Sequence, residues 1–191
     1  MSLQNRVDPF GNLHAVPHRE KWMGNRGLLH NDRKEIVRHS QLKRWIYCKL
    51  EFKGWHRQVM RPGHYTELFF LDEATALAAG HRPCMECQRE RATEFKRIWN
   101  EVNEPVRTMV EMDEVLRQPP RPHYLFAKPD EIPDGVMTVF EGQCYLIKQG
   151  KTHRWSFGGY QVVPLETEFL TIITPLPIMK IIAAGFKIDL P

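Results

Sequence analysis

Two cysteines, Cys84 and Cys87, stand three positions apart directly after a short predicted helix, and this arrangement constrains the fold more than any other feature. The helix is expected to begin at Asp72, a residue type that caps helix N-termini. It is expected to end at Gly80, because glycine tolerates the left-handed backbone that follows many helices. The proline before Cys84 suits a first helical turn, which predicts a second helix over 84–102 with both thiols at its start. Unpaired N–H groups at a helix start favour thiolates, the form of cysteine that binds zinc.

The composition is that of a globular protein and not of a membrane or disordered one. Hydrophobic residues make up 42% and charged residues 26% of the 191 positions, and no apolar run could span a bilayer. The N-terminal residues lack the apolar core of a signal peptide, so we expect a cytoplasmic protein. In that compartment four cysteines favour metal binding, reactivity or simple burial over a disulfide framework. A net charge of +4 permits a polyanionic partner without requiring one.

Two regions are predicted along the chain, and together they indicate an α+β fold. Residues 1 to about 35 are rich in Gly, Pro, Asn and His without a sustained period, which predicts loops with short strands. Aromatic and β-branched residues over 44–59 predict two strands joined by a turn at Gly54, with Cys48 in the first strand. A further strand is expected over 65–71.

A proline cluster at 119–122 predicts a boundary between a metal-binding region, 1–118, and a β-rich region, 119–191. Three dipeptides with turn chemistry follow it: Glu141-Gly142, Gln149-Gly150 and Gly158-Gly159. They separate short apolar segments, which predicts a small β-meander or barrel-like sheet. We expect this sheet to be followed by a strand over 169–174 and a short helix that ends at Gly185.

The cysteine spacing predicts a structural zinc site. Such a site needs four nitrogen or sulfur ligands held tetrahedrally, commonly a close pair plus donors from elsewhere in the chain. Cys48, on its predicted strand, is expected to supply the third sulfur. We place His56 first as the fourth ligand, because it comes from the same predicted hairpin, and His81 and Cys144 remain alternatives. The competing interpretation is that the thiols are simply buried or redox-capable.

The segment ALAAGHRPCMECQRE at 76–90 resembles the C-terminal half of the Ada-type metal-binding domain, the zinc module of bacterial methylphosphotriester repair proteins. In that family a helix ends in an AAG-x-RPC-x-x-C corner. WIYC at 45–48 is similar to the strand that carries the first cysteine of the module. YTELFFLDEA at 65–74 is similar to the strand that leads into its helix. The resemblance is confined to residues of about 45–90.

The resemblance implies a particular chemistry for the upstream cysteine. In the Ada-type family four cysteines hold zinc, and the first of the upstream pair accepts a methyl group from a DNA phosphotriester. Cys48 matches that acceptor by position, whereas Phe52 stands where the family has its second upstream cysteine. We assign no catalytic residue; any catalysis of this kind would be alkyl acceptance by the Cys48 thiolate.

Basic side chains flank the predicted metal corner and suggest a surface that contacts nucleic acid. Phosphate contacts supply most of the affinity that does not depend on sequence. The candidates are Lys43, Arg44, Lys49, Lys53, Arg57, Arg82 and Arg89. The alternative is an ordinary solvated face, because glutamates interleave with these cations along the predicted helix.

The N-terminal loop suggests a different function, that of a metal-dependent hydrolase or nuclease. Histidine and carboxylate together can bind a metal ion and activate water. The candidate residues are Asp8, His14, His18, His30, Asn31 and Asp32.

A third candidate lies in the C-terminal region, where three rings stand near Arg154: Trp155, Phe157 and Tyr160. Such rings stack on bases in single-strand binders. Packing in a core is the alternative explanation.

Overall fold

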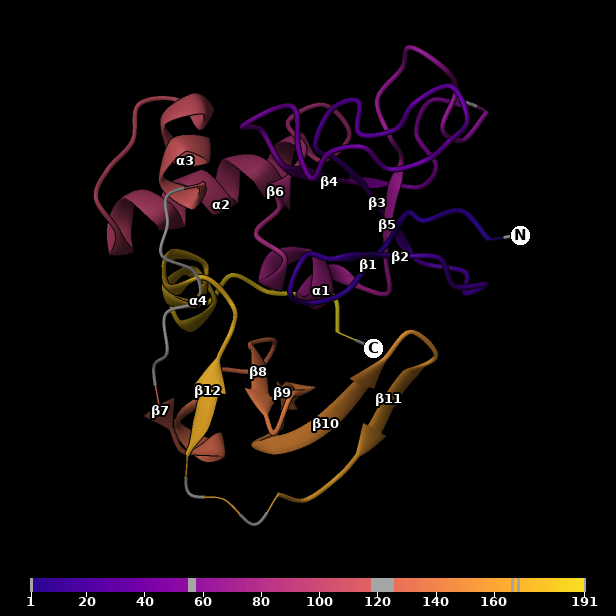
Figure 1. Ribbon diagram of the computed structural model, residues 1–191. Helices are drawn as coiled ribbons and strands as arrows, with labels where there is room; N and C mark the ends of the chain where they lie inside the picture. The colour runs from indigo at the N-terminus through magenta and orange to yellow at the C-terminus, as the bar shows by residue number, and fades with distance from the viewer. Residues whose placement is uncertain (1, 55–57, 118–125, 166, 168, 191) are drawn as a thin grey trace.

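The fold is α+β, as predicted, with two open sheets and four α-helices in the part of the chain described (Figure 1). A computed structural model describes residues 2–54, 58–117, 126–165, 167 and 169–190. His56 and Arg57 lie outside these residues. No helix in the described segments has the length and apolar content needed to cross a membrane.

The first sheet is built from six very short strands in the N-terminal half, in the order β2-β1-β5-β3-β4-β6. The strands are β1 (Arg6–Val7), β2 (Leu13–His14), β3 (Trp22–Asn25), β4 (Ile46–Lys49), β5 (Leu68–Phe70) and β6 (Arg82–Pro83). The loop-rich N-terminus therefore contributes three strands, and β4 carries Cys48 as expected.

Helix α1 (Glu73–Ala78) begins and ends where the sequence predicts. The Asp72 carboxylate accepts a hydrogen bond from the Thr75 N–H, and Gly80 has a φ of 78°. All six helical residues are buried, because α1 lies between the two sheets (Figure 1). The indole of Trp155, in the second sheet, donates to the Thr75 hydroxyl at 3.0 Å and joins α1 to that sheet.

Two predictions about the cysteine-bearing segments are wrong in detail. Helix α2 (Arg89–Val102) begins five residues after Cys84, so neither thiol lies in its first turn. The backbone N–H of Cys84 is already used in pairing with Tyr47, which extends the first sheet and delays the helix. The expected hairpin is also absent from the described residues of 44–59, because β4 pairs with β3 and β6 instead.

The second sheet confirms the predicted meander but not a barrel. Its strand order is β11-β10-β9-β8-β12-β7, and it does not close within the described residues. The strands are β7 (Phe126–Ala127), β8 (Met137–Phe140), β9 (Gln143–Lys148), β10 (Lys151–Ser156), β11 (Gly159–Val162) and β12 (Leu170–Ile172). In the turns Glu141-Gly142 and Gln149-Gly150 both residues have positive φ. This conformation matches the twist of the flanking strands and fixes the register of each hairpin.

One hydrophobic core joins the two halves of the chain. Helices α2, α3 (Met109–Leu116) and α4 (Leu176–Ala183) form a layer beside the sheets (Figure 1). The Phe95 ring packs edge-on against the Phe186 ring, with centroids 5.1 Å apart. The same buried cluster extends to side chains of both sheets, so it contains residues from either side of the boundary expected near residue 119.

Candidate metal centre

Strand pairing brings Cys48 and the C-x-x-C segment together although 36 residues separate them. Strand β4 runs parallel to β6, and Tyr47 lies opposite Pro83. The N–H of Cys84 donates to the Tyr47 carbonyl at 3.0 Å, and the Gln88 side-chain amide donates to the same carbonyl at 2.9 Å. Backbone pairing therefore places Cys84 beside Cys48.

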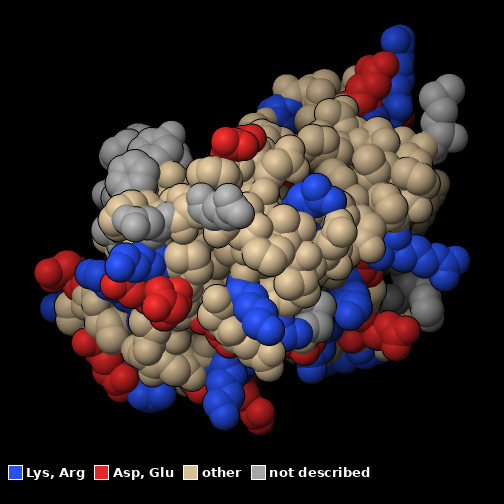
Figure 2. All heavy atoms as spheres, turned by 90° about the horizontal axis from the view of Figure 1, so that it is seen from below, with Lys and Arg blue, Asp and Glu red and all other residues tan. Residues whose placement is uncertain are grey.

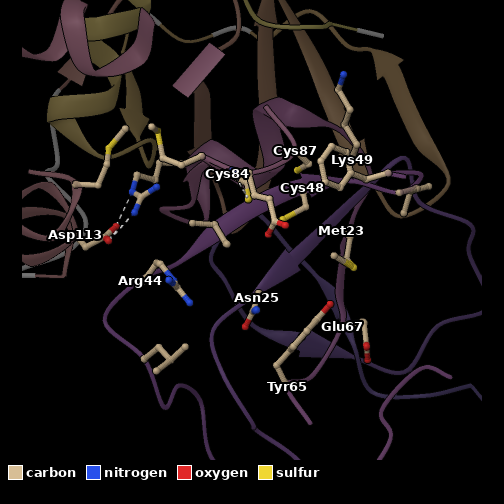
Figure 3. Close-up of a pocket in the computed structure, with 18 of the residues that line it drawn as sticks. Met23, Asn25, Arg44, Cys48, Lys49, Tyr65, Glu67, Cys84, Cys87 and Asp113 are labelled. Carbon is tan, nitrogen blue, oxygen red and sulfur yellow. Dashed lines mark hydrogen bonds and ion pairs between the residues drawn. The ribbon is translucent and has the colours of Figure 1, made fainter. Parts of the chain in front are cut away.

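The sulfur atoms of Cys48, Cys84 and Cys87 all lie within 4.8 Å of one another (Figure 3). Cys48 and Cys84 are buried, and Cys87 is half-buried. Sulfur ligands of one zinc ion lie about 2.3 Å from the metal, so a cluster of this size matches a shared ion. The three cysteines are therefore close enough to bind a metal, as the sequence predicted.

The C-x-x-C segment forms a tight turn that aims backbone donors at sulfur. The N–H of Gln88 donates to the Cys84 carbonyl at 3.1 Å and closes the turn. The N–H of Glu86 donates to the Cys84 sulfur at 3.4 Å. Such donors stabilise a thiolate in place of the helix start that the sequence suggested.

Protons are shared unevenly among the three sulfurs. Hydrogen bonds from Cys48 and Cys87, together with backbone N–H groups, lower the pKa of the Cys84 thiol well below its usual value. Hydrogen bonds to Cys84 and Cys87, together with burial, raise the pKa of the Cys48 thiol. Cys84 is thus a more acidic thiol than Cys48, and binding of a cation would release protons from the cluster.

All three cysteines line one cleft, of about 970 Å³. Its wall beside the sulfurs is apolar, because Ile46 and Met23 pack against the cysteine cluster. Further along the cleft lie Asn25, Arg44 and Tyr65, among others (Figure 3). A cleft of this size is typical of sites that bind small molecules or part of a larger ligand.

The described residues contain no fourth histidine, cysteine or carboxylate donor in this cluster. His56, our first choice, lies outside them. His81 is buried elsewhere, where its Nε2 faces the Arg26 guanidinium at 3.1 Å and its ring packs against Phe70. Cys144 lies in β9 within a separate apolar cluster, so it belongs to the core of the second sheet. Neither alternative joins the three sulfurs.

Only some of the basic residues predicted to contact nucleic acid line the cleft. Lys43, Arg44 and Lys49 are exposed and line the cleft, whereas Lys53 and Arg89 are exposed without lining it. Arg57 lies outside the described residues.

Arg82 was expected to contact nucleic acid but is buried. Its guanidinium forms a bidentate ion pair with the Asp113 carboxylate, with two hydrogen bonds of 2.7 Å. This buried pair fastens β6 to α3, so the guanidinium is not available to a phosphate. No local pattern predicts the pairing, because Asp113 lies 31 positions away on another helix.

Of the N-terminal residues predicted to form a hydrolytic metal site, only Asp8 and His14 are in contact with each other. The His14 Nε2 and the Asp8 carboxylate are 2.8 Å apart, and His18 stacks on the Phe157 ring. His30 is buried, with its two ring nitrogens next to the Thr66 hydroxyl and the Arg61 carbonyl. His30 therefore has a packing role and does not meet the Asp8–His14 pair.

The aromatic residues of the second sheet are used mainly in packing. The Trp155 indole donates a hydrogen bond to the Thr75 hydroxyl of α1, and the Tyr160 hydroxyl donates to the Asp72 carboxylate at 2.6 Å. The Trp155 and Phe157 rings pack edge-on with centroids 4.8 Å apart. These contacts fit the core-packing alternative.

Met23 lines the centre but was missed by sequence reasoning. It stands directly opposite Cys48 across the β3–β4 pair, so the two side chains share one face of the sheet. The segment Trp22–Asn25 has no clear alternation and contains Gly24. Only the register of the sheet reveals this neighbour.

No protein-family model, no curated protein and no solved structure matches this chain. The resemblance to the Ada-type domain therefore stands on its motif alone.

Proposed function

We propose that this chain binds zinc through Cys48, Cys84 and Cys87 and uses the cleft beside the metal to contact nucleic acid. The observation that supports metal binding is the convergence of three sulfurs from two distant segments within 4.8 Å. Thiolate donors in a tetrahedral arrangement suit zinc.

Nucleic-acid contact is supported by the charges beside the metal. Among the exposed residues that line the cleft, three are cations, Lys43, Arg44 and Lys49, and one is an anion, Glu86. Figure 2 shows the molecule from below, a face on which Lys and Arg lie among Asp and Glu. The excess of cations among the exposed residues of the cleft supports a phosphate backbone as the partner there.

Metal content of the purified protein tests the first part. After refolding with zinc, the wild type should hold about one ion per chain, and alanine variants of Cys48, Cys84 and Cys87 should lose it. Cys144→Ala is the matched control, because Cys144 is also buried but lies in another cluster. A wild type without metal, or equal loss in Cys144→Ala, contradicts the proposal.

Salt-dependent binding to duplex DNA tests the second part. Replacing Arg44 or Lys49 with glutamine should weaken binding and reduce the slope of log affinity against log salt by about 0.9 for each phosphate that the variant no longer neutralises. Lys180→Gln is the control, because Lys180 is exposed on α4 and does not line the cleft. Binding that does not weaken with salt, or equal weakening in all three variants, would overturn this part.

A further inference from the structure

Among the described residues, the three cysteines are partly enclosed by protein and line one wall of the cleft. Cys48 and Cys84 are 8% and 7% exposed, so protein encloses most of the cluster. All three sulfur-bearing residues nevertheless line the cleft, and Cys87 is half-buried. An ion held by three sulfurs would therefore direct its remaining coordination position into the cleft. Structural zinc sites are closed by a fourth protein ligand, whereas sites that act on other molecules keep one position open.

The surroundings of the sulfurs select among ligands for that position. Ile46 is buried with Cys48 and Cys84 in one cluster, and the Met23 side chain packs against it. These neighbours provide hydrocarbon and a thioether, which would pack against the apolar body of a ligand. Three thiolate donors also favour a soft fourth donor.

The cleft has room for the body of such a ligand. Its volume of about 970 Å³ exceeds that of a small molecule. Methionine and aromatic side chains line it near the metal, including Met85 and Phe69, and Asn25 and Arg44 line it further away. A ligand with a thiol at one end and a polar group at the other would meet matching surfaces at both ends.

We propose that the centre is an open three-cysteine metal site that binds an exogenous small-molecule thiol as its fourth ligand. This inference rests on the proposed metal binding by the three cysteines. On binding, the S–H bond of the thiol breaks and its proton goes to solvent, a metal–sulfur bond forms, and any metal-bound water leaves. No atom changes oxidation state, so the step needs no oxidant or reductant.

Cobalt(II) substituted for zinc gives a readout that does not depend on any activity. Thiolate-to-cobalt charge-transfer absorption grows with the number of sulfur ligands. Titrating the cobalt protein with 2-mercaptoethanol, with a phosphine as the only other reductant, should increase this absorption saturably by about one third, as three thiolates become four. Ethylene glycol, in which a hydroxyl replaces the thiol, should have no effect. Metal content after desalting should be unchanged.

His56→Ala decides which group supplies the fourth ligand. The same rise with the same midpoint in wild type and His56→Ala supports an exogenous thiol. A rise in His56→Ala but not in the wild type shows that His56 holds the position and overturns the proposal, as does a spectrum that the thiol leaves unchanged in both. If the wild type gives no charge-transfer absorption with cobalt, the metal-binding proposal itself fails, and this result differs from all the others.

Discussion

Glu20 carries a buried carboxyl group. Neither of its carboxylate oxygens has a hydrogen-bond partner among the described residues. Burial raises the pKa of Glu20 to about 7, Arg6 partly opposes this shift, and the negative charge of Asp72 adds to it. The Glu20 carboxyl group is therefore largely protonated, and so uncharged, below a pH of about 7.

The pH dependence of stability should therefore contain a contribution from Glu20. The folded protein keeps the proton up to a pH of about 7, whereas the unfolded chain loses it near 4.5. Because the folded state binds more protons between these values, this contribution to stability falls as pH rises through that window. Glu20→Gln cannot ionise, so it should exceed the wild type in free energy of unfolding by about 3 kcal/mol at pH 8 and match it at pH 4.

Urea unfolding at the two pH values measures this difference. Equal stability of wild type and Glu20→Gln at pH 8 would show that Glu20 is not held neutral. A deficit of the variant at both pH values would instead indicate that Glu20 makes a stabilising contact.

At the residue scale, the sequence predicted the three cysteines of the candidate metal centre but not their surroundings. Cys84 and Cys87 were found because metal-ligand spacing is local, and Cys48 because its flanking residues favour a strand. Met23 was missed, since its position opposite Cys48 depends on the register of a sheet whose strands are distant in sequence. The burial of Arg82 was missed for the same reason, because its partner Asp113 lies on another helix.

At the scale of elements, local chemistry predicted the second sheet better than the first. The turns of the meander each contain a glycine, and their positive φ values are fixed by two adjacent residues. The first sheet is assembled from strands of two to four residues with both parallel and antiparallel partners. Such short segments show too few alternations to predict a partner. The helix predicted to begin at Cys84 begins only at Arg89, because the backbone just before Cys84 pairs with β4 as strand β6.

Strand β3 depends on a glycine that allows close packing. A Cβ atom added to Gly24 would lie 2.3 Å from Cε2 of the Phe70 ring, which is itself fully buried. Gly24→Ala should therefore lower the free energy of unfolding by about 1–3 kcal/mol through overpacking. Because β3 pairs directly with β4, the variant should also bind metal more weakly. Chemical unfolding and zinc competition with a chelator would measure the two effects.

Gly142→Ala separates packing from backbone strain. A Cβ atom at Gly142 would meet nothing within 4 Å, but its φ of 76° is unfavourable for alanine. This variant should lose about 1 kcal/mol and keep its metal affinity. If both variants lost metal affinity equally, the link between β3 and the metal centre would be rejected.

At the scale of the whole molecule, Glu73 joins segments from both ends of the chain. This fully buried carboxylate accepts hydrogen bonds from the Tyr47 hydroxyl, from the Arg91 guanidinium at 2.5 and 2.7 Å, and from the Asp189 N–H at 2.8 Å. Arg91 also donates to the Lys187 carbonyl. The network therefore fastens the C-terminal tail to α1, α2 and β4.

Removing the Glu73 charge should be costly. Glu73→Gln leaves Arg91 without its anion, and we expect a loss of about 3 kcal/mol in the free energy of unfolding. Glu101→Gln is the matched control, because the Arg97–Glu101 pair is exposed and is expected to contribute less than about 1 kcal/mol. Urea unfolding of both variants gives the comparison, and equal losses would exclude a special role for the buried network.

Because both halves of the chain share one hydrophobic core, we expect them to unfold together. Side chains from the first sheet, the helical layer and the second sheet lie in one buried cluster, so neither half can unfold without exposing apolar surface of the other. Hydrogen bonds from Trp155 to Thr75 and from Tyr160 to Asp72 join the halves further. We expect a single cooperative thermal transition, with equal calorimetric and van't Hoff enthalpies. Zinc should raise its midpoint without splitting it, because binding to the folded state alone stabilises all residues that unfold together. Two separate transitions, of which zinc shifts only one, would instead establish independent domains that meet near residue 119.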